Sequence, residues 1–233
     1  MYAAHAESST FWLNVEGARR RVTVFATLHP MDTPLLYPSD IAFTDSVKAQ
    51  QIRMGSRRAY SHMEQGTGWQ TRITPELEEF IAARNSMYLA TANAAGQPYI
   101  QHRGGPPGFL RVLDDQTIGF ADFAGNKQYI TLGNIQENTK AHVFLMDYAH
   151  RRRIKIWGEL SAVEGDAALN ARLKPDGYKA RVERVMLIKV TAWDVNCPQH
   201  IPQKIDADDV SKALATRDAR IAELEAELEK LRG

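Results

Sequence analysis

A glycine-rich segment that carries a basic side chain is the first candidate for ligand binding. His102-Arg103-Gly104-Gly105-Pro106-Pro107-Gly108 places Arg103 beside adjacent glycines, where a ligand can approach the backbone because no Cβ intervenes. The segment matches neither a P-loop nor a dinucleotide-binding fingerprint. A wide turn is the simpler interpretation, and a loop that contacts an anionic ligand is the alternative.

A second candidate lies where a predicted strand ends and a predicted helix begins, at Asp122-Phe123-Ala124-Gly125-Asn126-Lys127. A helix N-terminus offers unpaired amides and positive potential, and Lys127 adds a full charge. The place suits a phosphate group, because hydrogen bonds to a charged group contribute about 1.5–3 kcal/mol each. The alternative is an ordinary helix start with Asn126 as its cap.

Three successive arginines, Arg151, Arg152 and Arg153, precede another predicted strand. Such a run is usually a solvated turn. Strand alternation, however, predicts that Arg151 and Arg153 share one face and that Arg152 lies on the other. An arginine on a face that meets the sheet interior or a subunit interface would require an anion.

Cys197 and His200 lie in one polar loop between Trp193 and Gln203. Their spacing is that of a zinc-binding pair, but no second pair completes a site, so we predict no metal. A Cys–His nucleophilic pair is an alternative, although Pro198 restricts the approach of the two side chains. The remaining interpretation is a polar loop that closes over a pocket.

The overall composition narrows the class of protein. The chain has 233 residues, of which 44% are hydrophobic and 24% charged, and its formal net charge is +1. These proportions are typical of an ordinary soluble domain and argue against nucleic acid as a main partner. The single cysteine excludes an intramolecular disulfide and fits a reducing compartment. No apolar stretch is long enough to span a membrane, and the first residues lack a signal-peptide pattern, so we predict a cytoplasmic protein.

Residues 1–70 form a predicted N-terminal extension. Strands are expected at 11–15 and 21–28 around a Glu16-Gly17 turn. A polar helix is expected from Thr44 to Met63, closed by a glycine-rich turn at Gly66-Thr67-Gly68.

The central segment, residues 71–205, changes from helical to strand-like periodicity at Ser86. Before that point Thr74 can cap a helix, with Pro75 at its first position. Short turns then separate seven predicted strands, with helices expected near 128–136 and 166–173. The strands are expected at 87–92, 98–103, 109–113, 117–123, 141–148, 153–163 and 184–195. This pattern predicts an antiparallel barrel or sandwich with helices outside.

The last segment, residues 206–233, has the composition of a long helix. It lacks proline and has no glycine before its last residue, and its apolar residues alternate in spacings of four and three. This is the a/d pattern of a coiled coil, interrupted by one polar residue. We predict a two-chain coiled coil; a single helix packed on the rest of the chain is the alternative. The pattern consists of Val210, Leu214, Arg217, Ile221, Leu224, Leu228 and Leu231.

Several short motifs follow one another in a characteristic order between Ile73 and Gln203. They are Tyr88-Leu89-Ala90-Thr91, Gly96-Gln97-Pro98-Tyr99, Gly119-Phe120-Ala121-Asp122, Gly125-Asn126-Lys127, Glu137-Asn138, Arg152-Arg153-Ile154-Lys155-Ile156-Trp157-Gly158 and Trp193. In order and spacing the chain resembles the pyridoxamine 5′-phosphate oxidase-like family of FMN-binding proteins. The resemblance implies a mainly β fold, a split antiparallel β-barrel of six to seven strands with flanking helices.

The resemblance also implies a homodimer with two FMN molecules at the subunit interface. Together with the predicted coiled coil, this gives a homodimer that is expected to associate through the barrel and the C-terminal helix. Gln101 stands where the oxidase has a phosphate-contacting arginine, and Arg103 can take over that task. Asn126 and Lys127 match the family's phosphate loop, and Trp193 matches an aromatic residue beside the flavin ring. The implied cofactor-binding residues are Gln101, His102, Arg103, Gly104, Asp122, Asn126, Lys127, Arg153, Trp193 and Gln203.

One departure from the family pattern bears on activity. The oxidase ends in an Arg-Leu-His-Asp-Arg stretch that engages its pyridoxal phosphate substrate, whereas this chain has Cys197-Pro198-Gln199-His200-Ile201-Pro202-Gln203. The missing arginines argue against vitamin B6 oxidation and indicate a distinct branch. The expected function is an FMN-dependent oxidoreductase acting on a small molecule, with Cys197 or His200 on the substrate side. A non-enzymatic flavin or haem carrier is one alternative, and binding of the deazaflavin F420 in place of FMN is another.

Overall fold

The computed structural model describes residues 6–15, 18–27, 36–64 and 68–232. By their contacts these residues belong to two compact units. The first runs as far as Met146 and continues through Arg153–Asn196, and it holds nearly all of the main sheet. The second combines Asp147–Arg152 with the segment that begins at Cys197, and it holds the last helix.

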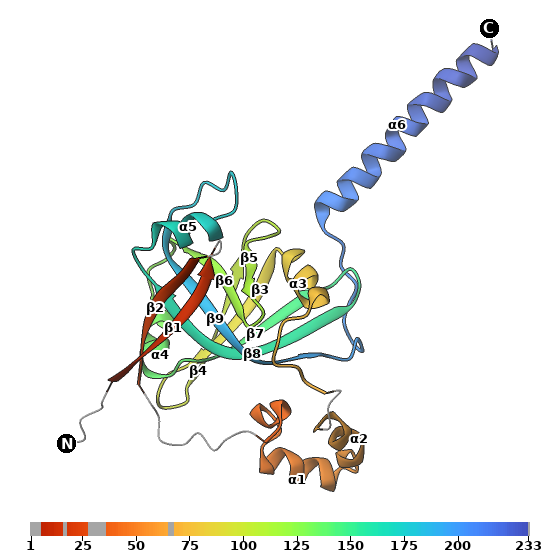
Figure 1. Ribbon diagram of the computed structural model, residues 1–233. Coiled ribbons are helices and arrows are strands. Elements are labelled where there is room, and N and C mark those ends of the chain that lie inside the picture. Colours follow the sequence, from red (N-terminus) through yellow and green to blue (C-terminus); the bar gives the residue numbers. More distant parts are fainter. Residues whose placement is uncertain (1–5, 16–17, 28–35, 65–67, 233) are drawn as a thin grey trace. The chain divides into compact units, whose positions relative to one another are not determined.

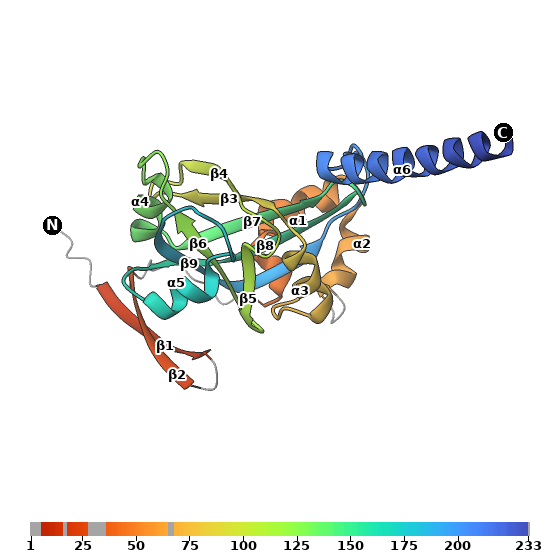
Figure 2. The same ribbon diagram turned by 90° about the horizontal axis from the view of Figure 1, so that it is seen from above.

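The main sheet has seven antiparallel strands in the order β4-β3-β7-β8-β9-β6-β5. It curls strongly without closing, so β4 and β5 remain as its edges and the result is a split barrel (Figures 1 and 2). The predicted mainly β fold is therefore confirmed. The strands are β3 (Ser86–Ala92), β4 (Pro98–Gly104), β5 (Leu110–Asp114), β6 (Thr117–Phe123), β7 (Lys140–Asp147), β8 (Arg152–Val163) and β9 (Val182–Val195).

Alternation of side chains along the strands builds the core. In β7 every second residue is buried, as expected for a strand with one face on the core. β6 is buried along nearly its whole length, because β5 and β9 flank it and α5 (Ala167–Leu173) packs against it. The largest fully buried side chains include Leu89, Phe120, Leu145, Ile156 and Leu160.

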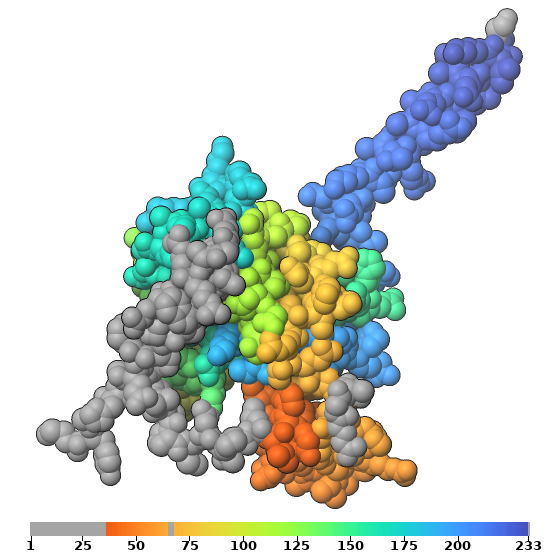
Figure 3. Space-filling view, in the orientation of Figure 1, coloured from red at the N-terminus to blue at the C-terminus, as the bar shows by residue number. Residues whose placement is uncertain are grey.

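Two predicted helices in the central segment begin with side-chain caps, of which the Thr74 cap was expected. The backbone N–H of Leu77 donates to Thr74 Oγ1 at 3.3 Å, and α3 (Pro75–Ala82) packs against β5 (Figure 3). The N–H of Leu169 donates to Asp166 Oδ1 at 2.8 Å at the start of α5. Each side chain satisfies an amide that has no partner within its own helix.

The predicted N-terminal hairpin is present and longer than expected. β1 (Ala6–Val15) pairs antiparallel with β2 (Ala18–Thr27), and Val15 lies opposite Ala18. The Glu16-Gly17 turn, Leu28, Gly66 and Thr67 lie outside the described residues.

The single helix expected from Thr44 to Met63 is wrong. After the short 3-10 helix η1 (Pro38–Ile41), the chain forms α1 (Asp45–Arg53), α2 (Arg57–Ser61) and the 3-10 turn η2 (His62–Glu64). Gly55 separates α1 from α2 with a φ of 75°, in the left-handed region that ends helices.

An aromatic cluster joins the segment before α3 to the sheet. The Trp69 and Trp157 rings stack with centroids 4.4 Å apart, and Phe43 lies 5.3 Å from Trp69. The half-buried His142 ring packs edge-on against Trp157 with ring centroids 4.7 Å apart. This cluster places a histidine of β7 in largely apolar surroundings.

The C-terminal helix α6 extends from Ala207 to Arg232 and buries none of its residues. Its bounds agree with the predicted segment. Within the described parts of the chain, no helix combines the length and the apolar character needed to cross a membrane.

Candidate functional site

A cavity of about 200 Å³ opens in the first unit between β4, β6, β9 and the loop before α4 (Ile130–Glu137). Five of the residues that the sequence singled out line it together. They are Gln101, Arg103, Asp122, Asn126 and Lys127. The two candidate segments, far apart in the sequence, thus contribute to one site.

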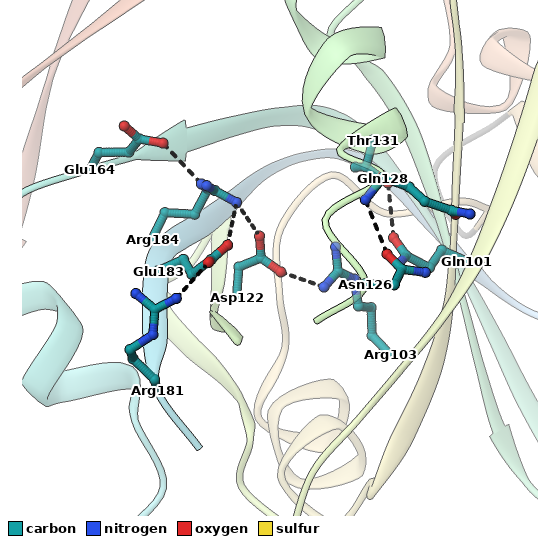
Figure 4. A network of polar contacts seen from close by, with 10 residues as sticks. All are labelled: Gln101, Arg103, Asp122, Asn126, Gln128, Thr131, Glu164, Arg181, Glu183 and Arg184. Carbon is teal, nitrogen blue, oxygen red and sulfur yellow. Dashed lines mark hydrogen bonds and ion pairs between the residues drawn. The ribbon is translucent and has the colours of Figure 1, made fainter. Parts of the chain in front are cut away.

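Asp122 lies between two arginines at the cavity (Figure 4). One carboxylate oxygen pairs with Arg103, and the other accepts a hydrogen bond from Arg184 Nη1 at 3.0 Å. The side chains of Asp122 and Arg184 are each about 10% exposed, so these charges interact with little screening by water. This arrangement fixes both guanidinium groups at the cavity.

Arg184 has further carboxylate partners. Its Nε donates to Glu164 at 2.9 Å, and its Nη1 lies 3.5 Å from Glu183. Burial acts to lower the pKa of Arg184, but the hydrogen bonds to Glu164 and Asp122 outweigh it and hold the pKa above its ordinary value. Arg184 therefore keeps its charge at any accessible pH.

The loop before α4 has an unusual backbone. Lys127 and Tyr129 both have positive φ, 59° and 53°, a region that residues other than glycine rarely occupy. Such strained positions concentrate at ligand-binding and catalytic sites. The Arg184 guanidinium lies 5.4 Å from the centre of the Tyr129 ring, which helps to hold Tyr129 in place.

The interpretation of Asn126 as a helix cap is wrong. α4 begins at Ile130, after Tyr129, whose side chain makes no capping hydrogen bond. Asn126 Oδ1 instead accepts from the backbone N–H of Gln128 at 3.2 Å, which closes a turn inside the loop. The helix starts later than predicted because two left-handed residues delay it.

Sequence reasoning missed several residues that line the cavity, among them Thr131, Tyr129 and Arg184. The Thr131 hydroxyl donates to Gln101 Oε1 at 3.1 Å and links the start of α4 to β4 (Figure 4). A signal for Arg184 was present, because it is a charged residue at the start of the long apolar run of β9. Charged residues are rarely buried unless they are paired.

Other implied cofactor residues of the first unit do not line the cavity. His102 is exposed on the opposite face of β4, where its ring meets Tyr88 edge-on at 5.8 Å. Gly104 ends β4 beside Asn85. Trp193 is buried, and its indole N–H donates to the Arg72 carbonyl at 2.7 Å.

The glycine-rich segment forms a turn. The N–H of Phe109 donates to the carbonyl of Pro106 at 2.9 Å, and Gly108 has a φ of 82°. Of this segment only Arg103, which belongs to β4, lines the cavity. The backbone therefore forms a turn here, which is the simpler of the two interpretations of this segment.

Strand alternation does not apply to Arg151. This residue lies in the turn before β8, with a φ of 53°, and the strand begins at Arg152. Arg153 is half-buried, and its Nε is a buried donor with no hydrogen-bond acceptor among the described residues.

The remaining candidates belong to the second unit. Cys197 and His200 are exposed, and His200 has a φ of 62°. Gln203 Nε2 donates to the Ala149 carbonyl at 2.9 Å. In the described portion of the chain, no group of three or more histidine, cysteine and acidic side chains is arranged so that it could hold a metal ion.

Comparison with known proteins gives a family match. The family model described as pyridoxamine 5′-phosphate oxidase matches residues 73–197, which is more than half of the chain. This stretch contains every residue that lines the cavity. No curated protein matches the chain in sequence.

Among solved structures, HupZ of Group A Streptococcus is similar with 22% identity and a TM-score of 0.44, covering 57% of this chain and 99% of its own. A putative pyridoxamine 5′-phosphate oxidase of Lactobacillus delbrueckii has 20% identity and a TM-score of 0.41, with coverages of 54% and 95%. An FMN-binding protein of Syntrophomonas wolfei has 18% identity and a TM-score of 0.41, with coverages of 67% and 98%. At these identities and TM-scores, the likenesses assign no ligand or activity to this chain.

Proposed function

This chain belongs to the pyridoxamine 5′-phosphate oxidase family, in a branch distinct from the true oxidase, and from this premise we propose that it binds FMN. In the proposal, the FMN phosphate lies at the loop formed by residues 125–129. The observation that carries the proposal is the position of Lys127 at the cavity and its lack of an ion pair within the described part of the chain. Lys127 lines the cavity, it is exposed, and it has no ion pair among the described residues.

The other positive charges at the cavity are already balanced. Asp122 lies between Arg103 and Arg184, and Glu164 and Glu183 lie beside Arg184. Lys127 therefore supplies the uncompensated charge that a dianionic phosphate needs. The first turn of α4 adds amides that have no partner within the helix, together with positive potential.

Arg103 also fits an anionic ligand. Its Nε is a buried donor that has no acceptor among the described residues, although its Nη1 pairs with Asp122. A buried donor without an acceptor costs about 1–3 kcal/mol. A phosphate oxygen within reach would remove that cost, which supports the role that the resemblance gives to Arg103.

The size of the cavity supports binding at a subunit interface. Pockets that enclose a cofactor-sized ligand usually measure about 300–1,000 Å³, and this cavity of about 200 Å³ is smaller. In the proposal it holds the phosphate end, and a second copy of the chain completes the wall around the ring. The homodimer would associate through the barrel and through α6 as a two-chain coiled coil.

The residues proposed near the ring are Arg153 and Trp193 of the first unit. Arg153 is the best supported, because its buried Nε has no acceptor among the described residues. His102 and Gly104 would contribute through the backbone of β4.

Bound FMN would supply a hydride acceptor, and the role of the chain would be to bind it, orient it and exclude water. We therefore propose an FMN-dependent oxidoreductase that acts on a small molecule in a reducing compartment such as the cytoplasm. The first alternative is a flavin or haem carrier without turnover. The second is F420, whose ring the same barrel could accept.

The absorbance spectrum of protein purified without added cofactor tests the proposal. We expect flavin bands, or a yellow complex after titration of the apo protein with FMN. Parallel titrations with F420 and with haem separate the alternatives. Protein that takes up none of these three ligands would remove the proposal. Bound flavin that NADH and NADPH both fail to reduce would favour the carrier.

A further inference from the structure

The helix α6 presents a continuous row of unburied apolar side chains. Within this row the aliphatic residues are 42–84% exposed, and α6 has no buried residue. An amphipathic helix gains most of its stability by burying its apolar stripe, and no described residue of the chain covers the stripe of α6. We call the row the heptad seam. It comprises Val210, Leu214, Arg217, Ile221, Leu224, Leu228 and Leu231.

The spacing of the heptad seam assigns its positions. Leu214, Ile221 and Leu228 fall at position a, and Arg217, Leu224 and Leu231 fall at the following d. A stripe restricted to a and d is narrow and fits one similar helix rather than a broad sheet face. The occupant that the pattern favours is a second copy of α6.

The charges beside the seam distinguish the two orientations. Arg220 and Glu227 occupy position g, whereas Glu225 and Arg232 occupy position e. In a parallel pair, position g faces position e of the other helix five residues further on. Arg220 would therefore face Glu225 of the second copy, and Glu227 would face its Arg232. Both contacts join opposite charges, and symmetry repeats each of them.

An antiparallel pair has unfavourable contacts in each register that keeps the seam buried. In such a pair e faces e and g faces g. The register that pairs Leu214 with Leu231 places Asp218 opposite Glu225 twice and Arg220 opposite Glu227 twice, so two unfavourable contacts offset two favourable ones, whereas all four contacts of the parallel pair are favourable. A shift by one heptad in one direction places Arg220 opposite Arg220 of the second copy. A shift in the other direction places Glu227 opposite Glu227 of the second copy. Like-charge contacts of this kind are the usual means of excluding an alternative pairing.

Arg217 is the one polar residue of the seam, and a parallel in-register pair places the two Arg217 side chains in one layer, where each needs a carboxylate beside it. A d residue packs beside position e of the facing helix, so each Arg217 would lie next to Asp218 of the second copy. In the structure the side chain of Arg220 pairs with Glu223 of its own helix at 2.8 Å, two residues before the Glu225 position. A polar residue within a seam costs stability and fixes register.

We propose that α6 pairs with α6 of a second copy as a parallel, in-register, two-stranded coiled coil. The inference rests on the proposed self-association, and it adds the orientation and the contacts that enforce it. It also predicts the symmetry of the assembly, because a parallel pair places its twofold axis along the coiled coil.

Disulfide trapping in the full chain tests the orientation. Cys197 is the only cysteine, so Cys197→Ser gives a background without thiols. Leu214→Cys and Leu231→Cys are then introduced separately. In a parallel pair each residue faces its own copy within the Cα separation that a disulfide bridges. We expect each variant alone to form a covalent dimer under mild oxidation.

Antiparallel pairing gives the opposite pattern. The two Leu231 positions would then lie 17 residues apart along the helix pair, about 25 Å. Only a mixture of the Leu214→Cys and Leu231→Cys proteins would cross-link efficiently. That pattern, or the absence of any cross-link, would overturn the inference.

A charge exchange tests the contacts that select the orientation. Glu225→Arg in the Leu231→Cys background turns two attractive contacts into repulsive ones, and we expect cross-linking about fivefold slower. Adding Arg220→Glu should restore the original rate. Equal rates in the three proteins would overturn the role of these charges.

Flavin absorbance of the protein that keeps Cys197, measured beside these samples, separates this inference from the proposed function. Yellow protein with uncross-linked helices would overturn the helix pairing alone. Cross-linked protein that takes up no FMN would overturn only the flavin proposal.

Discussion

Asp122 and Arg184 are direct cross-strand partners on β6 and β9, and their side chains hydrogen bond at 3.0 Å although 62 residues separate them in sequence. The same carboxylate pairs with Arg103 on β4. One acidic residue thus connects an edge strand of the sheet with a strand near its opposite edge, and it fixes two of the positive charges that line the cavity.

We predict that Asp122→Asn lowers the free energy of unfolding by about 2 kcal/mol. The amide keeps the shape of the side chain, but it leaves two largely buried guanidinium groups without their shared negative charge. Chemical denaturation measures the change. The matched control is Asp115→Asn, which breaks the exposed Arg72–Asp115 pair and should cost less than about 1 kcal/mol. Equal losses in the two variants would show that the position of Asp122 confers no special stability.

We predict that Lys127→Ala weakens FMN binding by about 1–3 kcal/mol, or about 5- to 150-fold in the dissociation constant, with the fold intact. The reason is that Lys127 lines the cavity and has no ion pair among the described residues. Fluorescence titration measures the affinity. Lys189→Ala, which removes an exposed lysine of β9, is the control and should bind as the unaltered protein does. An unchanged dissociation constant for Lys127→Ala would mean that the Lys127 side chain does not contribute to FMN binding.

We predict that Lys127→Gly is more stable than Lys127→Ala by about 1 kcal/mol. Both changes remove the ammonium group, but only glycine occupies a φ of 59° without a steric penalty. The two variants should therefore bind FMN with similarly reduced affinity while their unfolding free energies differ. If Lys127→Ala proved as stable as Lys127→Gly, this would show that residue 127 does not adopt the left-handed backbone conformation in the protein.

Local patterns in the sequence predicted most elements of the split barrel. Strand alternation and the Thr74 and Asp166 caps depend on neighbouring residues, so they can be recognised without tertiary information. The break between α1 and α2 could also have been predicted, because Gly55 interrupts an otherwise polar helical pattern.

The candidate site was predictable only in part. Arg103, Asp122, Asn126 and Lys127 stood out by type and by their place near element ends, Gln101 stood out through the family resemblance, and the structure brings all of them to one cavity. The contribution of Arg184 depends on the register between β6 and β9, which local sequence does not determine. The strain at Tyr129 likewise arises from tertiary contacts and not from the residue type, because tyrosine has no preference for positive φ.

We predict that His142 makes the protein less stable as the pH falls from about 6.5 towards 4. Burial in the aromatic cluster, assisted by the nearby positive charge of Lys155, lowers the pKa of His142 to about 4. The unfolded chain has an ordinary histidine pKa of about 6.5, so it takes up a proton first. Because the unfolded state then binds more protons, stability decreases through this window and is fully present above it.

The size of this effect should be about 2 kcal/mol between pH 7 and pH 4, once the solvent that reaches the half-buried ring is taken into account. His142→Phe keeps an aromatic contact with Trp157 and removes the titration, so its stability should fall less over the same range. His102→Phe, which replaces an exposed histidine of β4, should keep the pH dependence of the unaltered protein. The difference in unfolding free energy between each variant and the unaltered protein cancels the contributions of other titrating groups. One of these groups is Asp194, whose pKa is raised by burial. Parallel stability curves for the unaltered protein and His142→Phe from pH 7 to pH 4 would mean that His142 is protonated as readily in the folded protein as in the unfolded chain.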